Sequence, residues 1–487
     1  MKNIKKLILL TLLASVTANA DTHTQKTYLQ TRPFLSNLPM EYSTWHTQVN
    51  KKKIAPWGGS FQATGFFQKS CNESNLGEYF GYYAQTEGVN RNYINVTDVG
   101  IDNLNPLNIM HNLAAGVDAT GKFTLNPSQR TLGLRLDYYQ AIKKFFLKIS
   151  TPITHVENGI HPNVIGNLVV ATAGAATGQT IMNFFKGEVE DLDPASTNQQ
   201  EKLLYAKIDG AQSKTGLGDI EIALGYNIYK NKGHYFKAGI DLTIPTSNDA
   251  NAEWLFESIT GNGGYWGLGA SLDSKLMLWK ENKSRIELLA TLNLQYLFES
   301  TEKRTLGIKN YVTGFPQTPL GHYYLAGEEG QNALFPAANV LTQDVKVKPQ
   351  FHFEGLLGLS LISDNFTFDF GYNLFYKDEE HISLKNEWVD NKYALAAADF
   401  DSTGAFDTTV AGGGTFANSG PINSENIDLE PAQSPSALTN KIYVALGYAF
   451  NNWKRPLMFG IGGGYEFHSG NTALEGFEFW LKTALSF

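Results

Sequence analysis

Apolar and polar residues alternate along twelve stretches of the chain. Within residues 284–298, for example, Ile286 and Leu288 share one face, while Glu287 and Thr291 share the other. An alternation of period two is typical of a β-strand with two different faces. The twelve stretches are residues 59–69, 130–140, 143–151, 216–230, 234–245, 265–279, 284–298, 349–362, 365–376, 441–450, 456–468 and 473–487.

Most of these stretches are longer than the strands of soluble proteins. A globular strand averages about 5–6 residues, whereas a tilted strand needs about 9–11 residues to cross a bilayer. Tight links between the stretches alternate with long segments, except that the last link, at 469–472, is short where a long one is expected. The long segments are residues 70–129, 152–215, 246–264, 299–348 and 377–440.

This pattern predicts an all-β fold, namely a transmembrane, antiparallel, up-and-down β-barrel of 12 strands over residues 58–487. Fourteen strands are the fallback if part of residues 112–125 pairs. The barrel has to close, because an unpaired backbone group in hydrocarbon costs several kcal/mol. The short links are expected to be periplasmic turns and the long segments extracellular loops, and the even strand number places both termini on the periplasmic side. A soluble secreted β-sandwich is the alternative, but its strands and loops are shorter.

The first 20 residues have the pattern of a secretory signal peptide. Three lysines precede an apolar stretch at 7–16, and Ala18-Asn19-Ala20 forms a small-residue cleavage site before Asp21. The apolar stretch is too short for the alternative, a single membrane anchor. Residues 21–57 then form a periplasmic lead-in, and the sequence leaves open whether it plugs the barrel or lacks a fixed structure.

Composition narrows the function classes. The chain has 487 residues, 18% of them charged, and a formal net charge of -8, which argues against nucleic acid as a partner. Cys71 is the single cysteine, so disulfide scaffolds and Cys-rich zinc sites are excluded, and we expect a free thiol. Beyond the signal peptide no apolar run is long enough for a membrane helix, which excludes a polytopic helical protein.

The C-terminal strand carries a second targeting pattern. Phe479, Leu481, Leu485 and the terminal Phe487 alternate with polar residues. This ending resembles the C-terminal signal of Gram-negative outer-membrane proteins, which their barrel-assembly machinery reads. The resemblance implies an outer-membrane location, with that machinery and outer-membrane lipids as partners.

Charged residues fall on the face opposite the apolar one and are therefore expected to line the lumen. At mid-depth on the lipid face an Arg or Lys would cost about 2–4 kcal/mol. Two interpretations stay open, a structural lattice of salt bridges and a charged pathway for a solute through a narrow pore. The predicted lumen-lining residues are Arg135, Asp137, Lys144, Lys148, Asp219, Glu221, Lys237, Asp241, Asp273, Lys275, Glu287, His352, Glu354, Asp369, Lys441, Glu466, Glu478 and Lys482.

Two long segments have features of their own. Residues 377–440 carry eleven acidic side chains and three lysines, a surface suited to cations or to bridging divalent ions to lipopolysaccharide. Within that segment Asp399, Asp401, Thr403 and Asp407 are spaced like a calcium loop, but no bidentate Glu follows, so a solvated acidic loop is the default. Residues 177–186 and 198–208 predict two short helices, whose apolar patch is expected to enter the lumen or cover its mouth.

Nothing in the sequence predicts catalysis or a cofactor. His468-Ser469-Gly470-Asn471 has residue types found in outer-membrane phospholipase A, but adjacent strand residues point to opposite faces, and Ser-Gly-Asn is typical of a hairpin turn. A protease site of Asp and His at the barrel rim is a further alternative.

Three segments resemble a transporter family. Residues 215–220 open one strand with Gly-Asp, residues 242–247 close the next with Pro-Thr, and residues 261–269 form a Gly-rich entry. This order resembles the outer-membrane phenol meta-pathway transporters of hydrophobic compounds, except that Ser247 replaces a usual Gly. The resemblance implies passage of small apolar or aromatic molecules. The predicted function is a pore or transporter for small solutes, and the rival is a structural or adhesive surface barrel with a plugged lumen.

Overall fold

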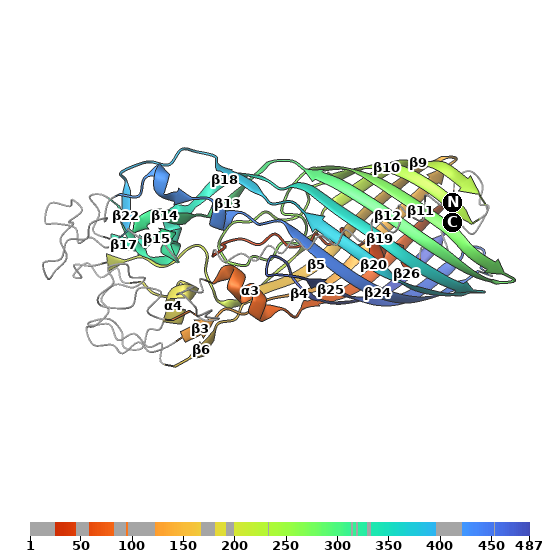
Figure 1. Cartoon of the computed structure of the whole chain (residues 1–487), viewed down its shortest axis with the longest axis horizontal. Coiled ribbons are helices and arrows are strands. Elements are labelled where there is room, and N and C mark those ends of the chain that lie inside the picture. Colours follow the sequence, from red (N-terminus) through yellow and green to blue (C-terminus); the bar gives the residue numbers. More distant parts are fainter. Residues whose placement is uncertain are drawn as a thin grey trace, which may run out of the picture.

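Twelve antiparallel strand positions close into a barrel in a computed structural model of the chain (Figure 1). Each strand pairs with its neighbour in sequence, and β1 closes the ring by pairing with both β4 and β26. The barrel strands are β1 (Gly59–Ser70), β4 (Pro127–Ile142), β5 (Phe145–Ile160), β8 (Gly210–Leu217) with β9 (Ile220–Asn231), β10 (His234–Ile244), β11 (Gly267–Glu281), β12 (Ser284–Leu297), β19 (Gln350–Ser363), β20 (Phe366–Lys377), β24 (Ala437–Phe450), β25 (Leu457–His468) and β26 (Gly476–Ser486). The predicted 12-stranded barrel is confirmed.

The structure describes residues 25–44, 58–81, 94–95, 122–166, 181–190, 199–231, 233–312, 315–317, 320–328, 333–395, 421–451 and 453–487. The predicted signal peptide and the calcium-like loop with Asp399, Asp401, Thr403 and Asp407 lie outside these residues. The fourteen-strand fallback is wrong for the described part of 112–125. There Lys122–Thr124 (β3) pairs with Ile94–Asn95 (β2) and Asn163–Ile165 (β6), in a small sheet separate from the barrel.

One strand continues past a proline where the sequence predicted its end. β5 pairs with β4 along its whole length, through Pro152 to Ile160. On its other edge β5 pairs with β9 up to Ser150 and with β8 from Ile153 onward. Pro152 lies at the break between these two partners, where no ladder donor is needed, and its carbonyl accepts from Gly218 N at 2.7 Å.

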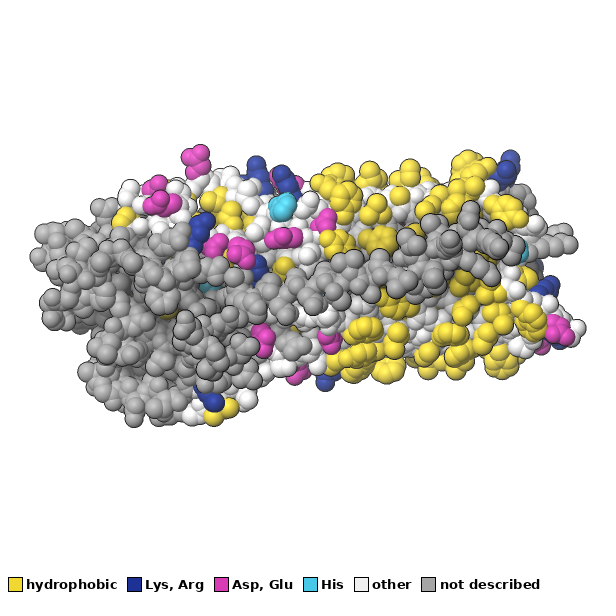
Figure 2. Space-filling view, viewed as in Figure 1, with side chains coloured by type: hydrophobic (Ala, Val, Ile, Leu, Met, Phe, Trp, Pro, Cys, Tyr) yellow, Lys and Arg dark blue, Asp and Glu magenta, His cyan; other side chains and the backbone are white. Residues whose placement is uncertain are grey.

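The outer face of the barrel carries a belt of exposed apolar side chains, and charged side chains lie beyond it (Figure 2). Leu224, Ile240 and Leu481 belong to this belt, while their strand neighbours Ala223, Asp241 and Lys482 are buried inward. This is the inverse of a soluble protein and matches a hydrocarbon environment. Separately, none of the helices among the described residues is long and apolar enough to cross a membrane.

Beyond one end of the barrel, which we call the loop end, the long loops fold into a cap (Figure 1). The cap strands and helices are β13 (Ser300–Thr305), β14 (Gly307–Val312), β15 (Phe315–Gln317), β16 (Leu325–Glu328), β17 (Ala333–Pro336), β18 (Thr342–Lys348), β21 (His381–Leu384), β22 (Tyr393–Leu395), β23 (Ile427–Asp428), β7 (Gln199–Gln200), α3 (Glu73–Phe80), α4 (Ile181–Lys186) and α5 (Ala338–Leu341), with 3-10 turns at Gly321–Tyr323 (η3), Ser424–Asn426 (η4) and Glu430–Ala432 (η5). Its core buries residues from every long loop, among them Phe80, Phe123, Leu255, Tyr323, Val345 and Ile422. The opposite end, with the short links, is the turn end.

The apolar patch of the second long loop belongs to this cap core. Phe184 and Phe185 on α4 pack edge-on against Tyr323, so the patch covers the mouth and does not enter the barrel. The helix expected at 198–208 is wrong. Gln199–Gln200 instead pairs with β17, and Ala206 has a φ of 54°, which a helix does not accommodate.

The N-terminal segment, residues 25–44, runs through the barrel, and we call it the plug (Figure 1). At the loop end Thr27 N donates to Pro431 O in the cap, and deeper in the lumen Lys482 Nζ donates to Ser43 O at 2.6 Å. Between them the plug forms the helix α2 (Leu38–Tyr42). Of the two alternatives left open for residues 21–57, a plug or a segment without fixed structure, residues 25–44 match the plug, because their charged and apolar side chains contact the inner wall.

Candidate functional site

The inner wall collects the charged residues that the alternation assigned to it, with one exception. Lys144 is exposed in the turn between β4 and β5, where strand alternation no longer applies, and its Nζ lies 5.8 Å above the Tyr226 ring. Glu221 and Glu466 are half-buried. The remaining residues are buried: Arg135, Asp137, Lys148, Asp219, Lys237, Asp241, Asp273, Lys275, Glu287, His352, Glu354, Asp369, Lys441, Glu478 and Lys482.

Some of these residues contact only the wall or a loop. Lys275 pairs with Glu287 at 3.2 Å across neighbouring strands, which matches the lattice interpretation. Lys237 Nζ lies over the rings of Tyr139 and Tyr235. Asp219 sits at the break between β8 and β9 and accepts from Ser247 Oγ and Asn262 N. Asp219 therefore fixes the 246–264 loop to the barrel.

The lower half of the plug is held to the wall by ion pairs of Glu41, near the C-terminal end of α2. Glu41 accepts from Arg135 at 2.6 Å and from Lys148 at 2.9 Å. Arg135 also pairs with Asp137 at 2.9 Å, and Lys148 with Glu221 at 3.3 Å. Arg135 and Lys148 therefore each have one ion-pair partner in the plug and one on the wall itself.

Further contacts lie around the same helix. Tyr42 Oη donates to Asp273 at 2.8 Å, and Thr44 N donates to the Asp369 carboxylate. Lys482 Nζ donates to the carbonyls of Glu41 and Ser43, at 3.0 Å and 2.6 Å. The carbonyls at the C-terminal end of α2 thus face a buried cation, which is the favourable arrangement for a helix end.

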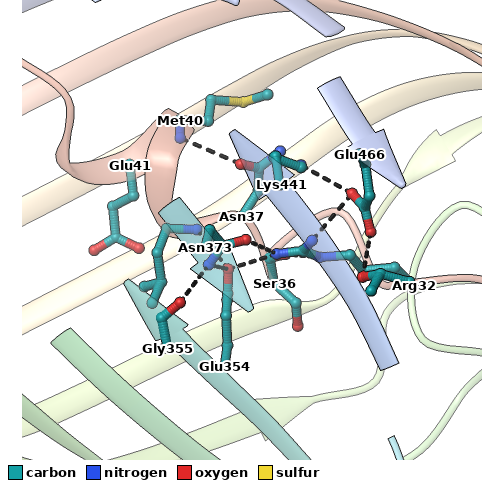
Figure 3. A network of polar contacts seen from close by, with 12 residues as sticks. Arg32, Ser36, Asn37, Met40, Glu41, Glu354, Gly355, Asn373, Lys441 and Glu466 are labelled. Carbon is teal, nitrogen blue, oxygen red and sulfur yellow. Dashed lines mark hydrogen bonds and ion pairs between the residues drawn. The ribbon is translucent and has the colours of Figure 1, made fainter. Parts of the chain in front are cut away.

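Arg32 forms the centre of the upper half of the plug (Figure 3). Its Nη2 donates to Glu354 Oε1 and to Asn373 Oδ1, at 2.6 Å each, and its Nη1 lies 3.0 Å from Glu466 Oε2. The guanidinium carbon lies 4.8 Å from the Phe375 ring centroid. Strands β19, β20 and β25 therefore surround this single plug side chain with carboxylates, an amide and a ring.

Apolar contacts hold the plug as well. Phe34, Leu38 and Met40 are buried in one cluster with wall residues that include Phe66 and Trp480. The Phe34 and Phe66 rings lie 6.2 Å apart. The plug is therefore held by both charge and packing, but no strand of the barrel depends on it for its own hydrogen bonds.

Two crevices remain beside the plug. The first lies between residues 29–37 and strands β1, β20, β24, β25 and β26, with an empty volume of about 800 Å³ that includes space open to solvent. The second has an empty volume of about 380 Å³ and is lined by Leu35 and Ser36 of the plug and by His352, Glu354 and Asn293 of the wall. The lumen is thus narrowed by the plug, with room left on two sides of it.

The start of the plug is anchored in the cap. Tyr28 packs on the guanidinium of Arg304, which pairs with Glu302 at 2.6 Å and with Glu380 at 3.4 Å. Burial raises the pKa of Glu302 to about 7, although the neighbouring Arg304 cation opposes this. Lys26 adds an ion pair with Glu430 at 3.2 Å. The plug is therefore fixed at both of its ends.

The plug contacts were not predicted from the sequence, although one local signal was present. Asn37 caps α2 by accepting from Met40 N, and Pro39 follows in the first turn. Asn followed closely by Pro is a typical helix start. That signal predicts a short helix but says nothing about where the helix docks.

The phospholipase-like residue set at 468–471 does not form a His–Ser pair in the structure. His468 uses its ring nitrogens on Leu438 O and Thr472 Oγ1, at 2.7 Å and 3.0 Å, and not on Ser469. Cys71 is an exposed free thiol whose Sγ lies 3.7 Å from Tyr465 Oη. Within the described ranges no group of His, Cys, Asp and Glu is arranged to hold a metal ion.

Comparisons with known proteins return barrels of low identity. No protein-family model and no curated protein matches the chain. An outer membrane channel from Pseudomonas putida F1 is 11% identical, with 90% of this chain and 98% of that chain covered and a TM-score of 0.38. The NanC porin is 8% identical over 72% and 92%, with a TM-score of 0.27. The transport unit of the autotransporter AIDA-I from Escherichia coli is 7% identical over 93% and 96%, with a TM-score of 0.31.

Proposed function

We propose that this chain is an outer-membrane channel for small solutes, closed at rest by its own N-terminal plug. The observation that carries the proposal is the plug itself, a segment of residues 25–44 that occupies and narrows the lumen without contributing to the barrel wall. A separate segment held to the wall through side-chain contacts can leave the lumen while the barrel stays intact. A lumen filled by the side chains of the wall itself has no such open state. We propose an orientation in the outer membrane in which the turn end faces the periplasm and the cap faces outward, toward lipopolysaccharide.

The charged wall favours polar solutes. With the plug displaced, a solute would pass carboxylates and cations such as Glu354, Asp273 and Lys148, which are costly to leave unpaired in contact with an apolar molecule. The resemblance to transporters of hydrophobic compounds remains a weaker indication, because it rests on glycines and turn residues and not on the lumen. We therefore propose small polar solutes as the transported class.

Single-channel recording in a planar bilayer tests the proposal. We expect the full chain to show rare, small steps, and a variant lacking residues 25–44 to show larger and more frequent ones. Asp364→Asn, in an exposed turn far from the lumen, is the matched control and should behave like the full chain. Silence of the plug-deleted variant, with heat-modifiable gel migration showing a folded barrel, would contradict a channel.

A structural or adhesive surface protein is the second candidate. The folded cap favours it, because a core built from all the long loops offers a stable outer surface. Under this alternative the cap closes the lumen independently of the plug. Both the full chain and the plug-deleted variant would then be silent, so the same recordings separate the two functions.

A further inference from the structure

The barrel wall carries a recognition site for a guanidinium group, and Arg32 of the plug occupies it (Figure 3). The Nε of Arg32 donates to Ser36 O of the plug itself, so the wall contacts only the two terminal nitrogens. Two oxygens from neighbouring strands, Glu354 Oε1 on β19 and Asn373 Oδ1 on β20, each accept from Nη2 at 2.6 Å. Glu466 on β25 lies 3.0 Å from Nη1, and the Phe375 ring lies under the guanidinium plane at 4.8 Å. Carboxylates in the plane and an aromatic ring beside it are the partners that distinguish a guanidinium from an ammonium.

The wall holds this site in shape by its own contacts. Asn373 Nδ2 donates to Glu354 Oε1 and to Gly355 O, at 2.9 Å each. Thr439 Oγ1 donates to Glu466 Oε1 at 2.5 Å. Because these bonds do not involve the plug, the acceptors stay aimed into the lumen when Arg32 leaves.

The negative charges of the wall around Arg32 also favour a bound cation at this site. Of the three carboxylates Glu354, Glu466 and Glu478, two pair with the wall cation Lys441, which lies 3.1 Å from Glu466 and 3.0 Å from Glu478. Lys69 and Lys377 line the same crevice. Glu354 has no ion-pair partner on the wall among the described residues; in the plug it contacts Arg32 and accepts from Leu38 N at 2.9 Å. A buried carboxylate without a counter-ion is costly, so withdrawal of the plug leaves a site with affinity for a replacement cation.

Space reaches the site from both sides. Arg32, Phe375 and Glu466 line the first crevice, while Glu354 and Phe375 line the second. Within the described part of the chain Arg32 Nη1 is buried without a hydrogen-bond partner, and its approach to Glu466 is an ion pair only. A solute entering by the first crevice would therefore meet this site at the plug itself.

We propose that this site binds small solutes carrying a guanidinium group, and that Arg32 is a tethered competitor which such a solute displaces. The proposal rests on the proposed channel function for its biological role, but the binding itself does not. A primary amine fits less well, because a compact ammonium cannot bridge Glu354, Asn373 and Glu466 as a planar fork does.

Equilibrium binding to the full chain in detergent micelles tests the site, with methylguanidinium as the probe and methylurea as its neutral control. We expect Arg32→Ala to bind methylguanidinium at least about tenfold more tightly than the unmodified chain, where the tethered Arg32 competes. Adding Glu354→Gln to Arg32→Ala should lower the affinity by about tenfold or more, because the charge-assisted bond is lost. Adding Glu287→Gln instead removes a buried wall carboxylate that lines neither crevice and should leave most of the affinity.

A second substitution at the same position keeps the test decisive if Arg32→Ala fails to fold. Arg32→Lys keeps a cation in the plug but cannot span the three acceptors, so we expect methylguanidinium to bind it more tightly than the unmodified chain. If both folded variants fail to bind methylguanidinium, or bind methylurea equally well, the proposal is overturned. Binding by a chain that never conducts would support this site and reject the channel, whereas a conducting chain without binding would reject only this site.

Discussion

Glu41 in the plug and Arg135 on β4 form an ion pair of 2.6 Å in which the Arg135 side chain is only 1% exposed. The pair joins a segment near the N-terminus to the wall of the barrel at a depth where water is scarce. Withdrawal of the plug would separate Glu41 from both Arg135 and Lys148 and would leave Arg135 with Asp137 alone, so we infer that this contact stabilises the closed state.

We expect Glu41→Gln to loosen the plug. Removing one partner of a buried ion pair costs about 3–5 kcal/mol, and a value near the lower end is expected because Arg135 keeps Asp137. Faster hydrogen exchange in residues 38–44 and more frequent channel openings should report it. Glu430→Gln is the control, since Glu430 is 45% exposed in its pair with Lys26 and such pairs contribute less than about 1 kcal/mol. Equal effects of the two variants would argue against stabilisation of the closed state by Glu41.

Acid should release the start of the plug from the cap. His322 is 2% exposed in the cap, its Nε2 lies 3.5 Å from Gln25 Nε2, and burial lowers its pKa to about 3. An unfolded His has a pKa of about 6.5, so cap stability is fully present above that pH and falls by up to about 1.4 kcal/mol per pH unit between about 6.5 and 3. Glu302, whose pKa is raised to about 7, acts in the opposite direction between about pH 4.5 and 7, so the test compares two chains. Limited proteolysis at pH 7 and pH 4.5 should show that His322→Gln loses less cap stability on acidification than the unmodified chain does. The same pH dependence in both chains would exclude a contribution from His322.

The barrel could be predicted from the sequence because the bilayer imposes a rule on every strand. Leu481 faces lipid while Lys482 faces the lumen, and this difference repeats along each strand at period two. The predictions from the sequence were wrong at positions where this alternation does not decide the structure. Lys144 lies in a turn, and Pro152 ends no strand because a second partner strand takes over at that point.

The plug could not be placed from the sequence. Its segment has no strand or helix periodicity beyond the short α2, and its partners are distant, with Arg32 and Glu354 separated by 322 positions. The charged lumen residues were predicted as a set. Their pairing with each other depends on strand register, and their pairing with the plug depends on the path of residues 25–44. No local sequence pattern encodes the register or that path.

A charge on the outer belt should destabilise the barrel in a membrane. Ile240, near the middle of β10, is 64% exposed, and Val389 in the loop-end cap is 61% exposed. We expect Ile240→Arg to cost about 2–4 kcal/mol in unfolding from lipid vesicles. Val389→Arg, at similar exposure, should stay within about 0.5 kcal/mol of the original chain. Similar costs for the two variants would mean that the belt around Ile240 does not face hydrocarbon.

The C-terminal residue should matter more for assembly than for stability. Phe487 exchanges two backbone hydrogen bonds with Gly59, at 2.8 Å and 2.9 Å, next to the seam between β1 and β26, and its ring stacks on Tyr138. Deleting Phe487 removes two hydrogen bonds of about 0.5–1.5 kcal/mol each beside a ladder that runs from Ser60 to Ser70, so the detergent-refolded barrel should keep its heat-modifiable migration. If assembly machinery reads the terminal aromatic residue, the yield of folded barrel in cells should fall several-fold, and Phe487→Trp should restore it. An equal loss in refolding and in cells would place the role of Phe487 in the seam and not in recognition.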